Sequence, residues 1–315
     1  MHIDPHVHCR DWNQAYKATI KSASDLARNQ GIVAIFDMPN TDPPITSKDL
    51  VRKRLKLAEQ VDCSDIYHLY IGATKNPKQI RECAEVVKKY PKVVGIKMFA
   101  GKSVGDLTII SEKDQARVYQ ELAQVDYDGV LAVHCEKESS FKMELWNSNN
   151  PATWNLTRPI EAEVDSIEDQ IRFAEEAGFE GNLHILHATS SKAVEVVQKA
   201  KSKLRITCGA TPHHLTLSTL NMRGRKGLRY KVNPPLRDYE TMLGLRDCLK
   251  EEKIDWIETD HAPHMREEKL FLPYMSGIQS LKFYSEFLNN LRSWGFTENQ
   301  IHRLTYENIK NVFNL

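Results

Sequence analysis

The chain has 315 residues, of which 41% are hydrophobic and 27% are charged, so it can bury a large core and is not a disordered chain. Its 43 basic and 42 acidic residues leave a net charge of +1, which argues against a polybasic nucleic-acid surface or an acidic tail. No apolar run approaches the ~20 residues of a membrane span, and the first residues, MHIDPHVHCR, lack the apolar core of a signal peptide. The six cysteines occur singly, which is typical of reduced thiols and predicts a cytoplasmic protein.

Short apolar runs alternate with longer helical patterns along the chain, which is typical of βα units. The expected strands are residues 1–4, 32–37, 66–73, 93–99, 129–135, 182–188, 204–210 and 255–260. The expected helices are residues 16–29, 48–60, a helix from 77, 112–123, 159–178, 191–201, 239–252, 279–293 and 297–313. The strands are continuously apolar, as strands buried on both faces should be. Eight such units predict a (β/α)8 TIM barrel that forms one domain over residues 1–315, with a doubly wound open sheet as the alternative.

Catalytic groups of a TIM barrel lie at the carboxyl ends of its strands. In this chain those ends carry polar residues of metal-ligand type, namely His6, His8, Asn40, Lys97, His134, His187, Asp260, His261 and His264. Core packing explains polar residues poorly at these positions. The pattern therefore predicts a functional site at this end of the barrel.

Histidine spacing at the first strand indicates a metal ion. His6 and His8 are two residues apart in an extended segment, so both imidazoles lie on one face and can bind one ion. Alone, this pair could equally be two ordinary polar residues, and His134 and His187 could each be core histidines. Together with Asp260 they favour a metal site. Asp260 could be a ligand, a general base or both, or simply the cap of a following helix.

Lys97 ends an apolar strand, where a charged ammonium group would be costly to bury. One interpretation is a side chain that reaches out to solvent or pairs with a carboxylate. The other is a lysine carboxylated by CO₂. Its carbamate would have two oxygens and could bridge two metal ions, and burial favours the neutral amine that this modification requires.

Eight short motifs follow one another from residue 4 to residue 264, within a resemblance that runs to about residue 280: DPHVHCRD, DMPNT, GIKMF, VHCE, LHATSS, TPHHLTL, VNPPLRD and TDHAPH. In this order, and at the expected strand ends, they resemble the dihydroorotases of the amidohydrolase superfamily. The resemblance implies a zinc-dependent hydrolase of pyrimidine biosynthesis, which reversibly cyclises N-carbamoyl-L-aspartate to L-dihydroorotate. It also implies one or two zinc ions, with two favoured.

The same resemblance implies a role for each matching residue. His6, His8 and Asp260 would hold the more buried ion, and carboxylated Lys97 would bridge it to a second ion that His134 and His187 complete. Asp260 would also be the catalytic base. The substrate contacts would be Arg10, Asn40, Asn233 and His264, the first two and His264 at the free carboxylate.

Arg10 separates this interpretation from its nearest alternative. Both substrates are anions, and a guanidinium group suits bidentate recognition of a carboxylate. Hydantoinase- or dihydropyrimidinase-like amidohydrolases act on rings without that carboxylate. An arginine beside metal cations, with no anion to meet, would be electrostatically unfavourable.

Two further alternatives are weaker. A scaffold protein that has lost catalysis would lack metal ligands, which are all present, and a nucleic-acid binder using the basic loop 223–231 conflicts with the balanced charge. We expect no accessory β-sandwich, and we interpret residues 100–108 as a plain loop rather than a lid. By analogy with the family we expect a homodimer, with association with aspartate transcarbamoylase as a further option, and no nucleic-acid or membrane partner.

Overall fold

Eight parallel strands form one sheet that is wound into a barrel in the computed structural model, which describes residues 1–103 and 107–315. The strands are β1 (His2–Val7), β2 (Ile32–Asp37), β3 (Tyr67–Gly72), β4 (Val93–Ala100), β5 (Val130–Cys135), β6 (Asn182–Ile185), β7 (Ile206–Ala210) and β8 (Trp256–Ile257). They pair in chain order, and a parallel bridge between Val7 and His261 joins the last segment to β1. The predicted TIM barrel is thus confirmed and the open sheet is wrong.

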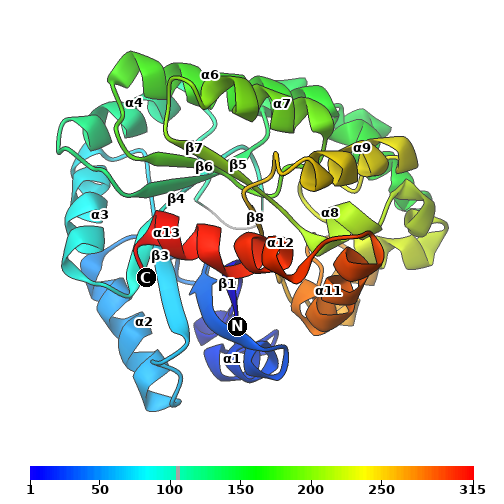
Figure 1. Cartoon of the computed structure of the whole chain (residues 1–315), viewed down its shortest axis with the longest axis horizontal. Coiled ribbons are helices and arrows are strands. Elements are labelled where there is room, and N and C mark those ends of the chain that lie inside the picture. The colour runs from blue at the N-terminus through cyan, green and yellow to red at the C-terminus, as the bar shows by residue number, and fades with distance from the viewer. Residues whose placement is uncertain (104–106) are drawn as a thin grey trace.

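Helices surround the barrel (Figure 1). They are α1 (Ile20–Asn29), α2 (Lys48–Gln60), α3 (Pro77–Lys89), α4 (Glu112–Ala123), α5 (Trp154–Thr157), α6 (Ile160–Ala177), α7 (Ser191–Ala200), α8 (Pro212–Thr216), α9 (Tyr239–Lys250), α10 (Arg266–Leu270), α11 (Tyr284–Ser293), α12 (Glu298–His302) and α13 (Asn308–Phe313). All named strands of the described residues belong to the one sheet. None of the described helices combines the length and the apolar character needed to cross a bilayer.

Three expected strands, β1, β6 and β8, end three residues away from the bounds that the sequence predicts, and the others agree to within two residues. β6 ends at Ile185 rather than at residue 188. β1 continues to Val7, so His6 lies inside a strand whose end was expected at residue 4. β8 was expected over residues 255–260 but pairs only at Trp256–Ile257. β8 ends early because the Thr259 N–H is not available to pair with a neighbouring strand. It donates instead to the side-chain carboxylate of Asp4 at 3.0 Å. The loop segment 100–108 includes residues 104–106, so the interpretation of it as a plain loop falls partly outside the described residues.

The C-terminal helices close the end of the barrel opposite to the predicted site. α12, a π-helical turn (Arg303–Glu307) and α13 run across this end, as Figure 1 shows in red. Phe313 packs against Phe36 inside the barrel, with ring centroids 4.9 Å apart. At the start of β1, His2 Nδ1 is hydrogen-bonded to Thr305 Oγ1 at 2.8 Å. The carboxyl ends of the strands therefore remain as the open end.

Candidate functional site

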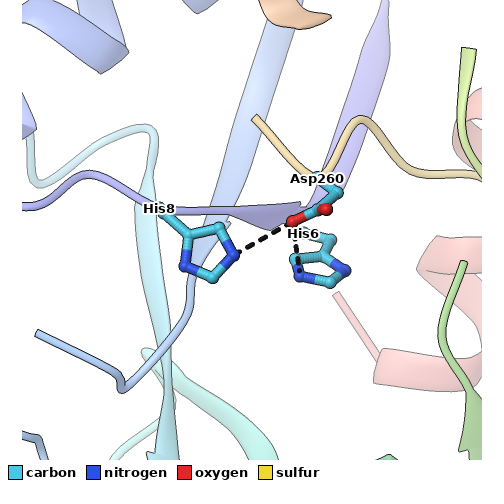
Figure 2. A group of neighbouring side chains, drawn as sticks. All are labelled: His6, His8 and Asp260. Carbon is cyan, nitrogen blue, oxygen red and sulfur yellow. Dashed lines mark hydrogen bonds and ion pairs between the residues drawn. The ribbon is translucent and has the colours of Figure 1, made fainter. Parts of the chain in front are cut away.

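His6, His8 and Asp260 form a compact cluster at the carboxyl end of the barrel (Figure 2). Asp260 Oδ1 lies 3.2 Å from His6 Nε2 and 3.0 Å from His8 Nε2. One ligand atom from each residue falls within 4.8 Å of the others. Imidazole nitrogen and carboxylate oxygen are the donors that zinc prefers, so this set fits a metal ion of that type.

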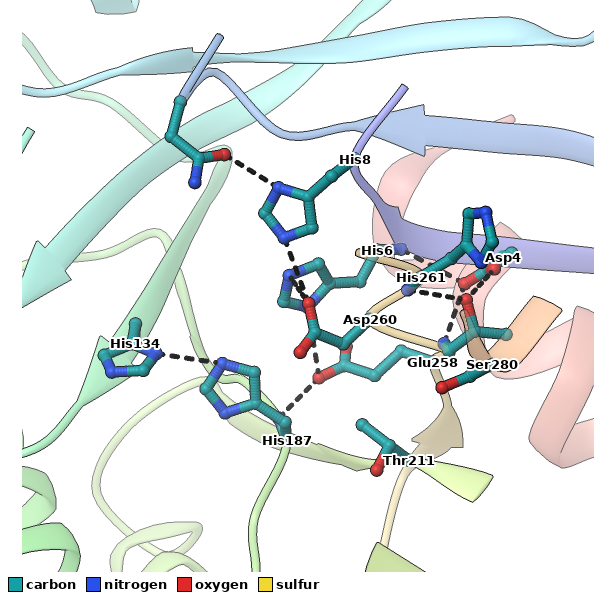
Figure 3. A network of polar contacts seen from close by, with 12 residues as sticks. Asp4, His6, His8, His134, His187, Thr211, Glu258, Asp260, His261 and Ser280 are labelled. Atoms are coloured by element: carbon teal, nitrogen blue, oxygen red, sulfur yellow. Dashed lines mark hydrogen bonds and ion pairs between the residues drawn. The ribbon is translucent and has the colours of Figure 1, made fainter. Parts of the chain in front are cut away.

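A second group of donors borders the first (Figure 3). His134 Nδ1 and His187 Nε2 face one another at 3.1 Å, and the rings of His187 and His6 are 5.3 Å apart. Lys97 is 1% exposed, yet its Nζ has no hydrogen-bond partner among the described residues, and neither has His187 Nδ1. Unpartnered buried polar atoms are costly, and this cost is removed if the group binds an ion or is modified. Burial lowers the pKa of Lys97 to about 7, which makes a neutral amine accessible.

A small cavity at this end of the barrel collects these side chains. Every residue predicted for the site lines it except His264. Asn40 borders the cavity and also orients a donor, since its Oδ1 accepts a hydrogen bond of 2.8 Å from His8 Nδ1. This bond fixes the proton on Nδ1 and leaves His8 Nε2 free to bind a metal. Asn233 also lines the cavity, and its Oδ1 accepts a hydrogen bond from Trp154 Nε1 at 3.0 Å.

Arg10 enters the same cavity as a buried cation. Its side chain is 2% exposed, Nε donates to the Pro263 carbonyl at 3.2 Å, and Nη2 donates to His264 Nε2 at 3.2 Å. Nη1 has no partner among the described residues. Burial lowers the pKa of Arg10 to about 10, so the group stays cationic at neutral pH. An unpartnered guanidinium donor beside a cavity is suited to an anionic ligand.

His264, expected at the substrate, therefore lies where it contacts Arg10 rather than the cavity. It is buried, and its Nδ1 is 3.5 Å from the Glu268 carboxylate. Its contact with Arg10 Nη2 helps to orient the guanidinium group.

Three of the site residues have a left-handed backbone. The φ angles are 61° at Arg10, 41° at His187 and 44° at Asp260. Non-glycine residues adopt this region at a cost of about 1–3 kcal/mol each and do so mostly at functional sites. Each of these turns directs a side chain from a strand end into the cavity.

Glu258 is a buried carboxylate that the sequence reasoning missed. It accepts hydrogen bonds from the His187 backbone N–H and from His184 Nε2, the latter at 3.0 Å. It also lies 3.7 Å from His6 Nδ1. His184 is buried beside this carboxylate. Glu258 thereby connects β6 to both groups of predicted metal ligands. The one sequence feature that could have identified Glu258 is its position two residues before Asp260.

Glu136 is the second missed residue and follows the VHCE motif's histidine by two positions. Its carboxylate accepts a hydrogen bond of 2.9 Å from His134 Nε2 and forms an ion pair with Arg158. Burial on its own raises the pKa of Glu136, but Arg158 and His134 outweigh it and lower the pKa to about 2. This bond places the ring proton on Nε2, so that His134 Nδ1 is unprotonated, as a metal ligand must be.

Glu136→Gln should lower the free energy of unfolding by roughly 3 kcal/mol, because Arg158 then remains buried without a carboxylate. Urea unfolding measures this change. The exposed Glu144→Gln is the matched control, and adding Arg158→Met to Glu136→Gln should recover part of the loss. Equal stability of the two single variants would contradict this account of the pair.

Sequence comparisons find curated dihydroorotases. The chain is 29% identical to the one from Methanosphaera stadtmanae and 31% identical to the one from Methanothermobacter thermautotrophicus, in each case over 99% of its length. It is also 31% identical over 89% of its length to the one from Lactobacillus helveticus. The chain spans about two thirds of these relatives, at 70%, 69% and 63% of their respective lengths. No protein-family model matches the chain.

Solved structures show the same fold. L-hydantoinase from Arthrobacter aurescens superposes with a TM-score of 0.88 at 24% identity, covering 99% of this chain and 70% of that one. Dihydroorotase from Campylobacter jejuni superposes with a TM-score of 0.73 at 16% identity, covering 100% of this chain and 83% of that one. These structural likenesses show a shared barrel fold. The family follows from the sequence relatives: the chain belongs to the dihydroorotase family.

Proposed function

We propose that this chain catalyses the dihydroorotase reaction, the reversible cyclisation of N-carbamoyl-L-aspartate to L-dihydroorotate. The observation that carries the proposal is Arg10, a buried guanidinium group whose Nη1 is unpartnered beside the metal-type cluster. That arrangement matches a substrate with an amide carbonyl near the metal and a carboxylate a few ångströms away. The reaction would serve pyrimidine biosynthesis.

We propose two zinc ions in this site. His6, His8 and Asp260 would hold one, His134 and His187 the other, and Lys97 as a carbamate would bridge them. When bound, such ions lower the pKa of water to about 7 and polarise a carbonyl oxygen. Glu136 would keep the His134 ring in place, since its carboxylate accepts a hydrogen bond from His134 Nε2. Glu258 would hold His187, since its carboxylate accepts a hydrogen bond from the His187 backbone N–H.

Asp260 is the proton carrier of the proposal. Its carboxylate lies at the centre of the cluster, and its pKa stays well below the ordinary value: burial raises it, but His6 and His8 more than offset this. In hydrolysis Asp260 takes a proton from the attacking water and returns it to the ring nitrogen as the amide bond breaks. In cyclisation Asp260 removes the proton from the ureido nitrogen, which attacks the side-chain carboxyl carbon. Asp260 then gives this proton to the departing carboxyl oxygen, which leaves as water with a second proton from solvent.

The residues proposed to orient the substrate are Arg10, Asn40 and Asn233. Arg10 would bind the free carboxylate through its unpartnered Nη1, with Asn40 beside it. Asn233, which lines the same cavity, would contact the ring. His264 is proposed to act on the substrate through Arg10, which it contacts directly.

The alternative is a hydantoinase-like enzyme. The superposition on an L-hydantoinase shows a shared fold and does not distinguish the two substrates. The dihydroorotase proposal is preferred because a ring without a carboxylate would leave Arg10 buried and unpaired.

We further propose that residues 1–315 act as one catalytic domain and that the enzyme is a homodimer, with aspartate transcarbamoylase as a further partner. All six cysteines are free and buried, which supports the proposal of a reducing, cytoplasmic setting.

The test is turnover of L-dihydroorotate and cyclisation of N-carbamoyl-L-aspartate by the purified protein, with zinc measured on the same sample. We expect both directions to proceed, to stop after chelation and to return when zinc is added. A zinc-loaded, folded protein that acts on neither substrate would contradict the proposed function.

A further inference from the structure

Lys231 and Lys269 are two buried lysines beside the active-site cavity, at 6% and 8% exposure. Neither forms an ion pair with a carboxylate among the described residues, although the chain has 42 acidic residues. Burial lowers the pKa of each to about 7. Two ammonium groups buried without carboxylates are costly, so their contacts should explain why they are there.

Lys269 uses its ammonium group to bind carbonyl oxygens. Its Nζ donates to the carbonyls of Lys231 at 2.9 Å, Met275 at 3.3 Å and Gly277. An ammonium group has three N–H donors and no acceptor, so these three carbonyls satisfy it. Lys269 thus ties the segment 274–277 to the end of the basic loop.

Lys231 reaches the same segment from that loop. Its Nζ donates to the Tyr274 carbonyl and to Ser276 Oγ, both at 2.8 Å. It also lies 3.9 Å from the ring centroid of Trp154, which is a favourable cation–π position. The same indole donates through Nε1 to the carbonyl of Val232 and to Asn233 Oδ1, each at 3.0 Å.

The segment that these lysines hold forms a wall of the cavity. Ser276 and Gly277 line it together with the four histidines assigned to the metals. Gly277 has a φ of 149°, and a Cβ there would lie 2.6 Å from the Ala262 carbonyl, so the backbone approaches too closely for any other residue. Its N–H donates to the Lys231 carbonyl at 2.9 Å. Small shifts of this backbone would therefore change the cavity directly.

We propose that Lys231 and Lys269 are paired positioning residues, which hold segment 274–277 as the substrate-facing wall and join it to Val232 and Asn233 through Trp154. This inference rests on the proposed function for its substrate. It gives a role to the basic loop's last residue and to a tryptophan of the segment after β5. A mere stabiliser of the loop could be apolar, whereas ammonium groups that bind specific carbonyls select one backbone conformation.

The experiment compares Lys231→Met and Lys269→Met with Lys226→Met, an exposed lysine of the same basic loop. We expect the KM for L-dihydroorotate to rise at least about tenfold in the first two, with kcat within about threefold and zinc content unchanged, because binding is lost equally in ground and transition states. Hydrogen exchange in residues 271–278 should accelerate in both. Lys231→Arg, which keeps a cation over Trp154, should restore part of the KM.

Kinetics and exchange that match Lys226→Met would overturn the proposal. A parallel fall of kcat and zinc content would also overturn it, since that outcome indicates general support of the site. Hydrogen exchange of the wild type is a test that does not depend on the variants or on turnover. The Met275 and Gly277 amides should be protected, and rapid exchange there would contradict the claim that segment 274–277 is held in one conformation. A wild type that is inactive on dihydroorotate but protected at these amides would reject the proposed function and retain the positioning role of the two lysines.

Discussion

Lys97→Ala is expected to lower kcat for L-dihydroorotate by about 10³-fold or more and to remove one of two zinc ions. Lys97 Nζ is buried and unpartnered among the described residues, and Lys97 lines the same cavity as the two groups of histidines that we assign to the metals. Loss of a bridging ligand removes charge stabilisation worth several kcal/mol, which corresponds to this factor. Steady-state kinetics and zinc analysis of the same preparation measure both effects.

Lys113→Ala, an exposed lysine on α4, is the control for this experiment and should leave both quantities unchanged. Acetate or a similar small carboxylate added to Lys97→Ala should restore part of the activity, because it can occupy the space of the carbamate. Wild-type activity and zinc content in Lys97→Ala would contradict the bridging role and leave Lys97 as a buried amine without a part in the reaction.

Much of the barrel is predictable from local patterns. The alternation of apolar runs with amphipathic segments predicts β2 and α2 to the residue, since Ser47 is a recognisable cap and Ile32–Asp37 is a continuous apolar run ended by an aspartate. The end of β8 is not predictable in this way. It depends on the contact of Thr259 with Asp4, more than 250 positions away in the chain.

Ligand-type residues at strand ends are also visible in the sequence, because TIM barrels gather those ends at one face. Glu136 and Glu258 were missed because each acts through a histidine on another position, and one-dimensional spacing does not show which histidine a buried carboxylate meets. The contact of His264 with Arg10 is equally invisible in the sequence, because it arises from the loop after β8.

The basic loop shows the opposite difficulty. Its charges suggest an exposed surface that attracts anions, and Arg225 and Lys226 are indeed exposed. Lys231, the last of the run, is instead buried against Trp154 and segment 274–277. Charge composition does not distinguish these two environments, because the difference depends on loops that come from separate βα units.

Arg10→Met is the second prediction with a large expected effect. The value of kcat/KM for L-dihydroorotate should fall about 10²- to 10³-fold, since the substrate carboxylate loses its buried cationic partner. Zinc content should stay at the wild-type level, because Arg10 contacts Pro263 and His264 rather than the ligand atoms. Arg266→Met, at an exposed arginine of α10, is the matched control.

The most direct test of the account is the ratio of kcat/KM for L-dihydroorotate to kcat/KM for dihydrouracil, the same ring without the carboxylate, in the wild type and in Arg10→Met. The wild type should strongly prefer dihydroorotate, and the preference should collapse toward equality in the variant while zinc stays bound. A wild type that prefers dihydrouracil, or a ratio that Arg10→Met leaves unchanged, would contradict the claim that this site is built for a carboxylate-bearing ring.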